Sequence, residues 1–146
     1  GDLTGKTVGL LGLTFKPNTD DMREAPSLEI ARRLAKNNVV VRGYDPVGME
    51  RASEMMPELI MAQDPYALAE GCDALIVCTD WNEFKHLDLS RVLRSMKQPI
   101  IVDGRNIYDP TQLSQLGFQY RGVGRGYGPD GEPVEENSSS AKVSAK

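Results

Sequence analysis

The sequence predicts an α/β fold, a Rossmann-like three-layer sandwich with a mostly parallel sheet of about five or six strands. Short apolar runs alternate with helical patterns along the chain, and the links between them are short. The strongest runs are apolar at nearly every position, which is typical of strands buried on both faces. With 146 residues, 40% of them hydrophobic, the chain has enough apolar content for one ordinary domain.

The first third of the chain supplies two strand patterns with a helix between them. Residues 7–13 (TVGLLGL) form a nearly continuous apolar run and predict the first strand. A helix should open at Pro26 and reach residue 38, because its apolar residues fall at helical spacing and basic residues crowd its last turn. Residues 39–44 (VVVRGY) predict the second strand, which Asp45-Pro46 should stop.

The same alternation continues to the end of the folded part. We expect, in order, a short helix over 48–56, a brief edge strand over 59–62, a helix capped by Asp64-Pro65 and ending at 70, a strand over 74–78, a helix over 89–96, a strand over 99–102, a helix over 110–116 stopped by Gly117, and a strand over 118–123. Residues 1–124 should form the domain. Residues 125–146 are rich in Gly, Pro, Ser and Glu and predict a disordered tail.

The composition excludes several classes of protein. A net charge of −4 argues against a nucleic-acid surface. No apolar run reaches the length of a membrane span, and the first residues do not resemble a signal peptide. The two cysteines, Cys72 and Cys78, lack a paired spacing, so we expect reduced thiols and a cytoplasmic protein. Since the sequence begins without methionine and enters a strand almost at once, we expect a fragment of something longer.

Polar motifs follow four of the predicted strands, where ligands bind in open α/β sheets. They read FKPNTDDMRE, YDP, TDWNEF and DGRN. Lys16 and Arg105 should lie at one edge of the sheet, where a point charge and a planar guanidinium can together hold a diphosphate. Phe15 could lie beside a flat base. The plainer alternatives are that Phe15 covers the end of the sheet, that Lys16 is a solvated loop lysine, and that Asp103 only orients Arg105.

The first loop is not a dinucleotide fingerprint. That fingerprint requires G-x-G-x-x-G running directly into a helix. Here the order is Gly9-Leu-Leu-Gly12-Leu-Thr-Phe15, so phenylalanine takes the place of the third glycine, and about ten more residues precede the helix. Asp45 does end the second strand, but within a DP turn. We therefore do not expect a self-contained NAD site, and no P-loop is present.

Taken together, four motifs resemble the C-terminal domain of the UDP-glucose dehydrogenases. They are GLTFKPNTDDMREAPSLEI, GYDP, DALIVCTDWNEF and IIVDGRNIYDP, and the resemblance runs in order from about residue 5 to residue 124. The related GDP-mannose dehydrogenases share the first loop but look different near DGRN. The resemblance therefore favours a UDP-sugar as the ligand.

The resemblance implies a specific enzyme and specific roles. Enzymes of this family have an N-terminal NAD-binding Rossmann domain, a central helical segment and this C-terminal domain, and they act in polysaccharide biosynthesis. They oxidise C6 of UDP-glucose twice, with two NAD+, through a catalytic cysteine, to give UDP-glucuronate. On the matching positions, Phe15, Lys16 and Arg105 would contact the substrate. Arg23 would reach NAD bound on the other domain.

Departures from the whole-enzyme pattern limit what this chain should do alone. It lacks the N-terminal fingerprint and the segment with the catalytic cysteine, so we expect it to bind a UDP-sugar weakly and to oxidise nothing. Cys72 and Cys78 should be structural thiols, and His86 should be a surface residue; Trp81 should pack at the domain interface or cap the core. The full enzyme should be a homo-oligomer and the fragment monomeric.

Three alternatives remain open from the sequence. The chain could be a free-standing Rossmann-like binding or regulatory module without catalysis. It could be a complete nucleotide-binding enzyme of flavodoxin-like fold, although it offers no evident nucleophile, metal cluster or general base. It could also belong to a dehydrogenase for another UDP-hexose.

Overall fold

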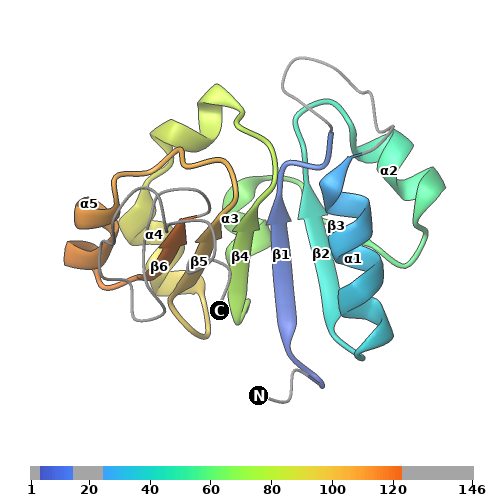
Figure 1. Cartoon of the computed structure of the whole chain (residues 1–146), viewed down its shortest axis with the longest axis horizontal. Helices are drawn as coiled ribbons and strands as arrows, with labels where there is room; N and C mark the ends of the chain where they lie inside the picture. The colour runs from blue at the N-terminus through green and yellow to red at the C-terminus, as the bar shows by residue number, and fades with distance from the viewer. Residues whose placement is uncertain (1–3, 15–24, 123–146) are drawn as a thin grey trace, which may run out of the picture.

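A computed structural model describes residues 4–14 and 25–122 of the chain. These residues form one six-stranded sheet in which every neighbouring pair of strands is parallel, in the order β3-β2-β1-β4-β5-β6 (Figure 1). The strands are β1 (Thr7–Leu11), β2 (Val40–Tyr44), β3 (Ile60–Met61), β4 (Ala74–Val77), β5 (Ile100–Asp103) and β6 (Gln119–Gly122). The predicted fold class is confirmed, and the sheet is parallel throughout.

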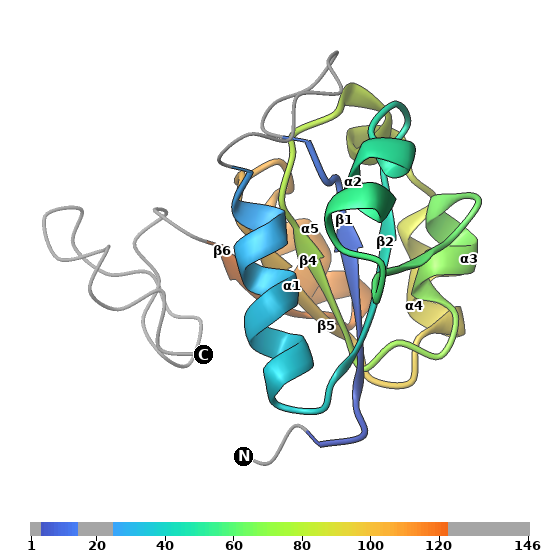
Figure 2. The same cartoon turned by 90° about the vertical axis from the view of Figure 1, so that its right-hand side faces the viewer.

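Helices cover both faces of this sheet and complete the three layers. They are α1 (Pro26–Lys36), α2 (Met49–Met55), α3 (Pro65–Ala69), the 3-10 helix η1 (Asn82–His86), α4 (Leu89–Ser95) and α5 (Pro110–Leu116). Figure 2 shows α1 on one side of the sheet and α3 and α4 on the other. None of the helices in the described part of the chain is long and apolar enough to cross a membrane.

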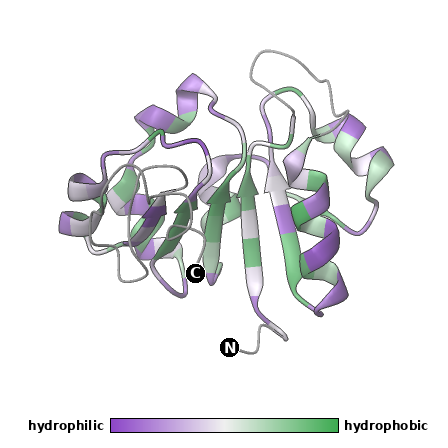
Figure 3. Ribbon diagram, viewed as in Figure 1, coloured by the Kyte–Doolittle hydropathy of each residue, from purple (hydrophilic) through white to green (hydrophobic). Residues whose placement is uncertain are grey.

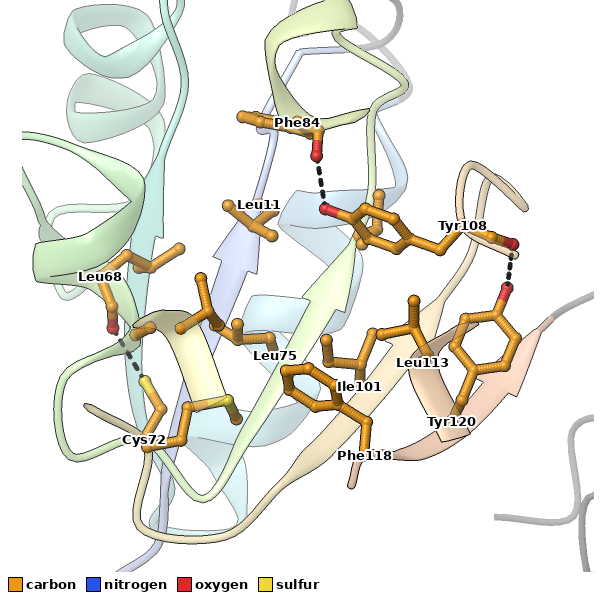
Figure 4. Packing of buried hydrophobic residues seen from close by; sticks show 14 of the residues in the cluster. Leu11, Leu68, Cys72, Leu75, Phe84, Ile101, Tyr108, Leu113, Phe118 and Tyr120 are labelled. Carbon is orange, nitrogen blue, oxygen red and sulfur yellow. Dashed lines mark hydrogen bonds between the residues drawn. The ribbon is translucent and has the colours of Figure 1, made fainter. Parts of the chain in front are cut away.

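Among the described residues, two separate hydrophobic clusters fill the spaces between the layers. One packs α3, α4 and α5 against the sheet, with Leu75 and Ile101 near its centre and Phe84 at one end (Figure 4). The other packs α1 and α2 against the opposite face, around Leu10 and Leu13. Figure 3 shows the same division, with hydrophobic strands inside and hydrophilic residues on the outer helices. The near-continuous apolar runs in the sequence follow from this burial on both faces.

Local signals in the sequence set the helix ends. Asp64 caps α3 by accepting a hydrogen bond from the Ala67 amide, and Pro65 follows at the first helical position. Gly117 ends α5 in the left-handed conformation, with φ of 112°. Each predicted helix and strand is present, with ends that match the prediction or differ from it by one or two residues. The 3-10 helix η1 was not predicted, because TDWNEF carries no helical periodicity.

Asp73 secures the amino end of the sheet. Its carboxylate accepts hydrogen bonds from the Thr7 amide at the start of β1 and from the Gln98 side chain before β5, each 2.9 Å long. The hydrogen bond from Gln98, together with the one from Thr7 and nearby lysines, lowers the pKa of Asp73 below its ordinary value of 3.8. Folding therefore favours the ionised form of this carboxyl group.

This shift predicts a pH-dependent contribution of Asp73 to stability. Because its folded pKa is depressed, the contribution is fully present above the ordinary pKa of 3.8 and is lost as the pH falls through the folded value. Asp73→Asn should lower the free energy of unfolding by about 1 kcal/mol at pH 7. Urea unfolding at pH 7 and at acidic pH should show the difference from wild type shrinking on acidification.

The exposed Glu58 supplies a control for this prediction, since Glu58→Gln removes one carboxylate from the surface. That variant should match the wild type at both pH values. A deficit in Asp73→Asn that stays constant or grows on acidification would contradict the assignment.

Candidate functional site

The carboxyl ends of β1, β2, β4 and β5 lie at one edge of the sheet and carry the polar motifs found in the sequence (Figure 1). The helices that follow β1 and β2 pack on one face, and those that follow β4 and β5 pack on the other. The strand order therefore reverses between β1 and β4. In open parallel sheets, ligands bind outside the strand ends at this point.

Asp45 lies at the end of β2 and joins three of the loops at this edge. Its side chain is fully buried. Its two oxygens accept six hydrogen bonds of 2.7–3.2 Å, from the backbone amides of Leu13, Thr14, Val47 and Gly48, the Thr14 hydroxyl and the Trp81 indole. One carboxylate thus fixes the exit of β1, the turn after β2 and the segment after β4 relative to one another.

The hydrogen bonding of Asp45 differs from that of the acidic residue in a dinucleotide-binding site. In dinucleotide-binding folds, an acidic residue near the end of the second strand accepts hydrogen bonds from a ribose hydroxyl. Asp45 holds a comparable place in the chain, but its oxygens are buried and already bonded to the protein. The described residues therefore do not fit NAD in the standard Rossmann manner, in agreement with the missing fingerprint in the first loop.

Gly12 lets β1 end against β4. Its φ is +90°, and a β-carbon at this position would lie 2.5 Å from the β-carbon of Thr79. Only glycine tolerates both conditions. The amide of Gly12 donates to the Tyr44 carbonyl, and the Thr79 hydroxyl donates to the Thr14 carbonyl, so the exit of β1 is bonded on both sides. β1 accordingly ends at Leu11, two residues earlier than predicted.

Asp103 performs a similar task in the DGRN loop after β5. It is fully buried and accepts hydrogen bonds from the amides of Arg105 and Tyr108 and from the Tyr120 hydroxyl, at 3.2, 2.9 and 2.8 Å. Gly104 passes so close to β4 that a β-carbon there would lie 2.7 Å from the Val77 carbonyl oxygen. Asp103 therefore orients the backbone of Arg105. Among the described residues, the Arg105 guanidinium pairs with Asp80 and not with Asp103.

Arg105 is the predicted ligand contact that the structure describes. Its side chain is 43% exposed, and its Nη2 lies 3.6 Å from Oδ1 of Asp80, which follows β4. A partly exposed guanidinium therefore lies on a hydrogen-bonded loop at the carboxyl ends of the strands. The other predicted contacts, Phe15, Lys16 and Arg23, lie outside the described residues.

The remaining aromatic and histidine predictions can be placed. Trp81 is 8% exposed and packs in the cluster beneath α3, α4 and α5, so it caps the core of this chain. His86 is exposed in η1, as expected.

The sequence did not indicate a role for Tyr44, whose hydroxyl donates a hydrogen bond of 3.2 Å to Glu83. Burial, followed by the charge of Glu83, raises the pKa of Tyr44 to about 12, which keeps it a hydrogen-bond donor at neutral pH.

Both cysteines are buried, free thiols. Cys72 donates to the Leu68 carbonyl within the core cluster, at 3.0 Å (Figure 4). Burial raises the pKa of Cys72 to about 11 and that of Cys78 to about 12, so neither is a thiolate at neutral pH. Cys78 lies one residue beyond β4, which ends at Val77 and not at the predicted residue 78.

Among the described residues, no group of three or more His, Cys, Asp or Glu side chains is arranged to hold a metal ion.

Comparison with known families identifies the domain. The profile of the UDP-glucose/GDP-mannose dehydrogenase family, UDP binding domain, matches residues 9–110. The chain belongs to this family. It is 46% identical over 125 residues to a UDP-glucose 6-dehydrogenase of Rhizobium meliloti and 44% identical over 131 residues to one of Pseudomonas aeruginosa. Each alignment covers 86% of this chain and 29% of the relative, so the chain spans less than a third of either enzyme's length.

Solved structures of the same family share the fold. A UDP-glucose dehydrogenase from Pyrobaculum islandicum superimposes with a TM-score of 0.64 at 37% identity, covering 73% of this chain and 23% of that one. A UDP-D-ManNAc dehydrogenase from Pyrococcus horikoshii superimposes with a TM-score of 0.67 at 30% identity, covering 86% and 27%. The predicted resemblance to this family is confirmed.

The bonding of Asp45 predicts a large stability cost for a small change. Asp45→Asn replaces one acceptor oxygen by an NH2 group that would face N–H donors, leaving buried donors unsatisfied. We expect the free energy of unfolding to fall by about 2–3 kcal/mol, measured by urea denaturation. Asp109→Asn is the matched control, because Asp109 is a helix N-cap and asparagine caps about as well. Equal stability of the two variants would refute the central role of Asp45.

The state of the cysteines predicts their reactivity. Cys72 and Cys78 should resist a thiol reagent such as DTNB at pH 8 in the native chain, because both are buried and protonated. Both should react rapidly in 6 M guanidinium chloride, a condition in which small domains are generally unfolded. Fast labelling of either thiol in the native chain would show an accessible thiolate, against the structural role assigned here.

Proposed function

We propose that the chain is the UDP-sugar-binding part of a UDP-glucose 6-dehydrogenase, an NAD-dependent oxidoreductase that converts UDP-glucose to UDP-glucuronate. The observation that carries this proposal is Arg105, a partly exposed guanidinium on the Asp103-braced loop at the strand ends. A planar guanidinium held in place suits the diphosphate of a nucleotide sugar. The family match, whose domain is described as UDP binding, supports the same ligand.

The proposed site combines Arg105 with residues of the first loop. Phe15 and Lys16 contact the substrate, and Arg23 contacts NAD held by the N-terminal domain of the same enzyme. This loop begins at the point where Asp45 and Thr79 fix the backbone of Thr14. The hydrogen bonds that fix Thr14 come directly before Phe15 and Lys16 in the sequence. Binding energy from the nucleotide can therefore be used to position the sugar for reaction elsewhere in the enzyme.

Binding and chemistry are divided between this chain and the rest of the enzyme. The relatives are more than three times as long as the aligned segment, which leaves room for a domain that binds NAD and supplies the catalytic cysteine. The buried, protonated Cys72 and Cys78 do not suit that role. The chain alone therefore binds without oxidising its ligand. We assign the domain to residues 1–124; the tail predicted over residues 125–146 lies outside the described residues. The complete enzyme is a cytoplasmic homo-oligomer whose isolated domain is monomeric.

A dehydrogenase for another UDP-hexose is the second candidate. The similar structure from Pyrococcus horikoshii is a UDP-D-ManNAc dehydrogenase, at 30% identity. The UDP-glucose 6-dehydrogenases of Rhizobium meliloti and Pseudomonas aeruginosa are closer in sequence, at 46% and 44%, which favours glucose. Turnover of UDP-glucose against UDP-N-acetylhexosamines by the complete enzyme separates the two. A free-standing regulatory module is excluded if the coding sequence upstream carries a dinucleotide fingerprint and the cysteine segment.

Arg105→Ala tests the proposed ligand contact. We expect the affinity for UDP to fall roughly 10- to 100-fold, because a hydrogen bond to a charged group contributes about 1.5–3 kcal/mol. Backbone amide shifts of the isotope-labelled chain, titrated with UDP to roughly 10 mM, measure this affinity. Arg94→Ala is the control, because Arg94 is exposed on α4, away from the strand ends.

The same titration separates nucleotide-sugar binding from dinucleotide binding. UDP should shift the amides of residues 12–14 and 103–106. Shifts near residues 9–12 with NAD+ and none with UDP would contradict the proposal and indicate a dinucleotide-binding domain. Equal UDP affinities in Arg105→Ala and wild type would remove Arg105 from the site.

A further inference from the structure

Asp80 and Arg105 form an ion pair between the ends of β4 and β5 that is close but not hydrogen-bonded. Asp80 Oδ1 lies 3.6 Å from Arg105 Nη2, beyond the usual hydrogen-bonding distance. This oxygen is shielded from solvent and accepts no hydrogen bond from the described part of the chain. Within the described part of the chain, the hydrogen bond that Arg105 donates comes from its backbone amide and goes to Asp103, so its guanidinium donates none there. Both charged groups therefore retain bonding capacity.

Rigid supports hold the pair in this arrangement. Asp80 lies between two buried residues, Thr79 and Trp81, whose side chains donate to the Thr14 carbonyl and to Asp45. Of these three residues, Asp80 is the one with a partly exposed side chain, at 36%. The backbone of Arg105 is held by Asp103, and Gly104 donates to the Val77 carbonyl at the end of β4. The fold thus brings a carboxylate to the one described guanidinium proposed to bind ligand.

Asp80 should be readily displaced from this ion pair by another anion. The side chains of Arg105 and Asp80 are 43% and 36% exposed and their nearest atoms lie beyond hydrogen-bonding distance, so the pair contributes little to stability. A diphosphate offers the guanidinium several anionic oxygens and bidentate geometry, which gives stronger hydrogen bonds. A bound diphosphate should therefore displace Asp80 as the partner of Arg105. The carboxylate then remains close to the ligand, with the same sign of charge.

We propose that Asp80 is an affinity-setting residue that pairs with Arg105 in the free chain and competes with the ligand's diphosphate for the same guanidinium. This inference rests on the proposed function, because it takes the ligand to be a nucleoside diphosphate. The inference adds Asp80, whose negative charge opposes binding of the diphosphate, to the residues that should contact the ligand. The consequence is weaker binding than Arg105 alone would give, and hence faster release of a UDP-sugar product.

Asp80→Asn isolates the charge, because asparagine keeps the size of the side chain and one oxygen toward Arg105. We expect UDP to bind roughly three- to tenfold more tightly, the scale of removing one like charge several ångströms away at a partly exposed site. The affinity for uridine, which lacks the diphosphate, should not change. The gain should shrink when the ionic strength rises from about 0.02 to 0.15 M. Amide-shift titrations of the 146-residue chain measure all three effects.

Matched variants separate this role from a general change in charge. Glu29→Gln also removes the carboxylate of a surface ion pair, with Arg33 on α1, and should leave the UDP affinity unchanged. Asp80→Glu keeps the charge and should stay within about twofold of wild type, on the scale of a surface pair. Asp80→Ser repeats the removal of charge with a second side chain if Asp80→Asn perturbs the amide spectrum of the free chain. In an Arg105→Ala background, the gain from Asp80→Asn should be smaller, because the contested guanidinium is gone.

The outcomes distinguish the two proposals. Tighter UDP binding in Asp80→Asn, with unchanged uridine binding, supports the competition. Weaker UDP binding would mean that Asp80 pre-orients Arg105, and unchanged binding would mean that the pair is incidental; either overturns the inference. If Arg105→Ala leaves the UDP affinity intact, it is the proposed binding site that has failed, whatever Asp80→Asn does.

Discussion

The buried carboxylate of Asp45 makes the hydrogen bonds on which the arrangement of loops at the carboxyl ends of the strands depends. A carboxylate placed inside a protein is costly unless its oxygens are bonded, and here each oxygen is satisfied by amides or side chains of neighbouring loops. The bonds come from segments that follow three different strands. Those segments cannot shift independently without leaving a charge unpaired in the interior. The edge is therefore rigid where the first loop leaves β1.

Asp103 repeats the same solution at the end of β5. Both aspartates are fully buried, and both bond backbone amides of the loop that follows them. The two braces lie on either side of the point where the strand order reverses. They leave the nearby charged side chains, Asp80 and Arg105, partly exposed on fixed backbone. Rigid backbone beneath exposed charge is the arrangement that binding sites require.

The fold shares its sheet with dinucleotide-binding domains but differs from them in the loops at the strand ends. Its strand order is the one found in dinucleotide-binding domains. In those domains a short glycine-rich turn connects the first strand to its helix and approaches the pyrophosphate. Here residues 12–25 separate β1 from α1, and the acidic residue after β2 supports the protein instead of a ribose. The framework is kept, while the loops at its edge determine what can bind.

The sequence by itself determined the order and type of the main elements, because apolar periodicity and caps such as Asp64 and Gly117 are local signals. Its four motifs also identified the family, and the spacing around Gly12 ruled out a dinucleotide fingerprint. Only the tertiary structure decided the separate roles of Asp45, Asp80 and Asp103. Asp103 ends a strand and the other two follow one, each in a similar polar motif, but burial depends on which strands and loops pack around it. Strand order and packing left Asp80 partly exposed beside Arg105 and enclosed the other two.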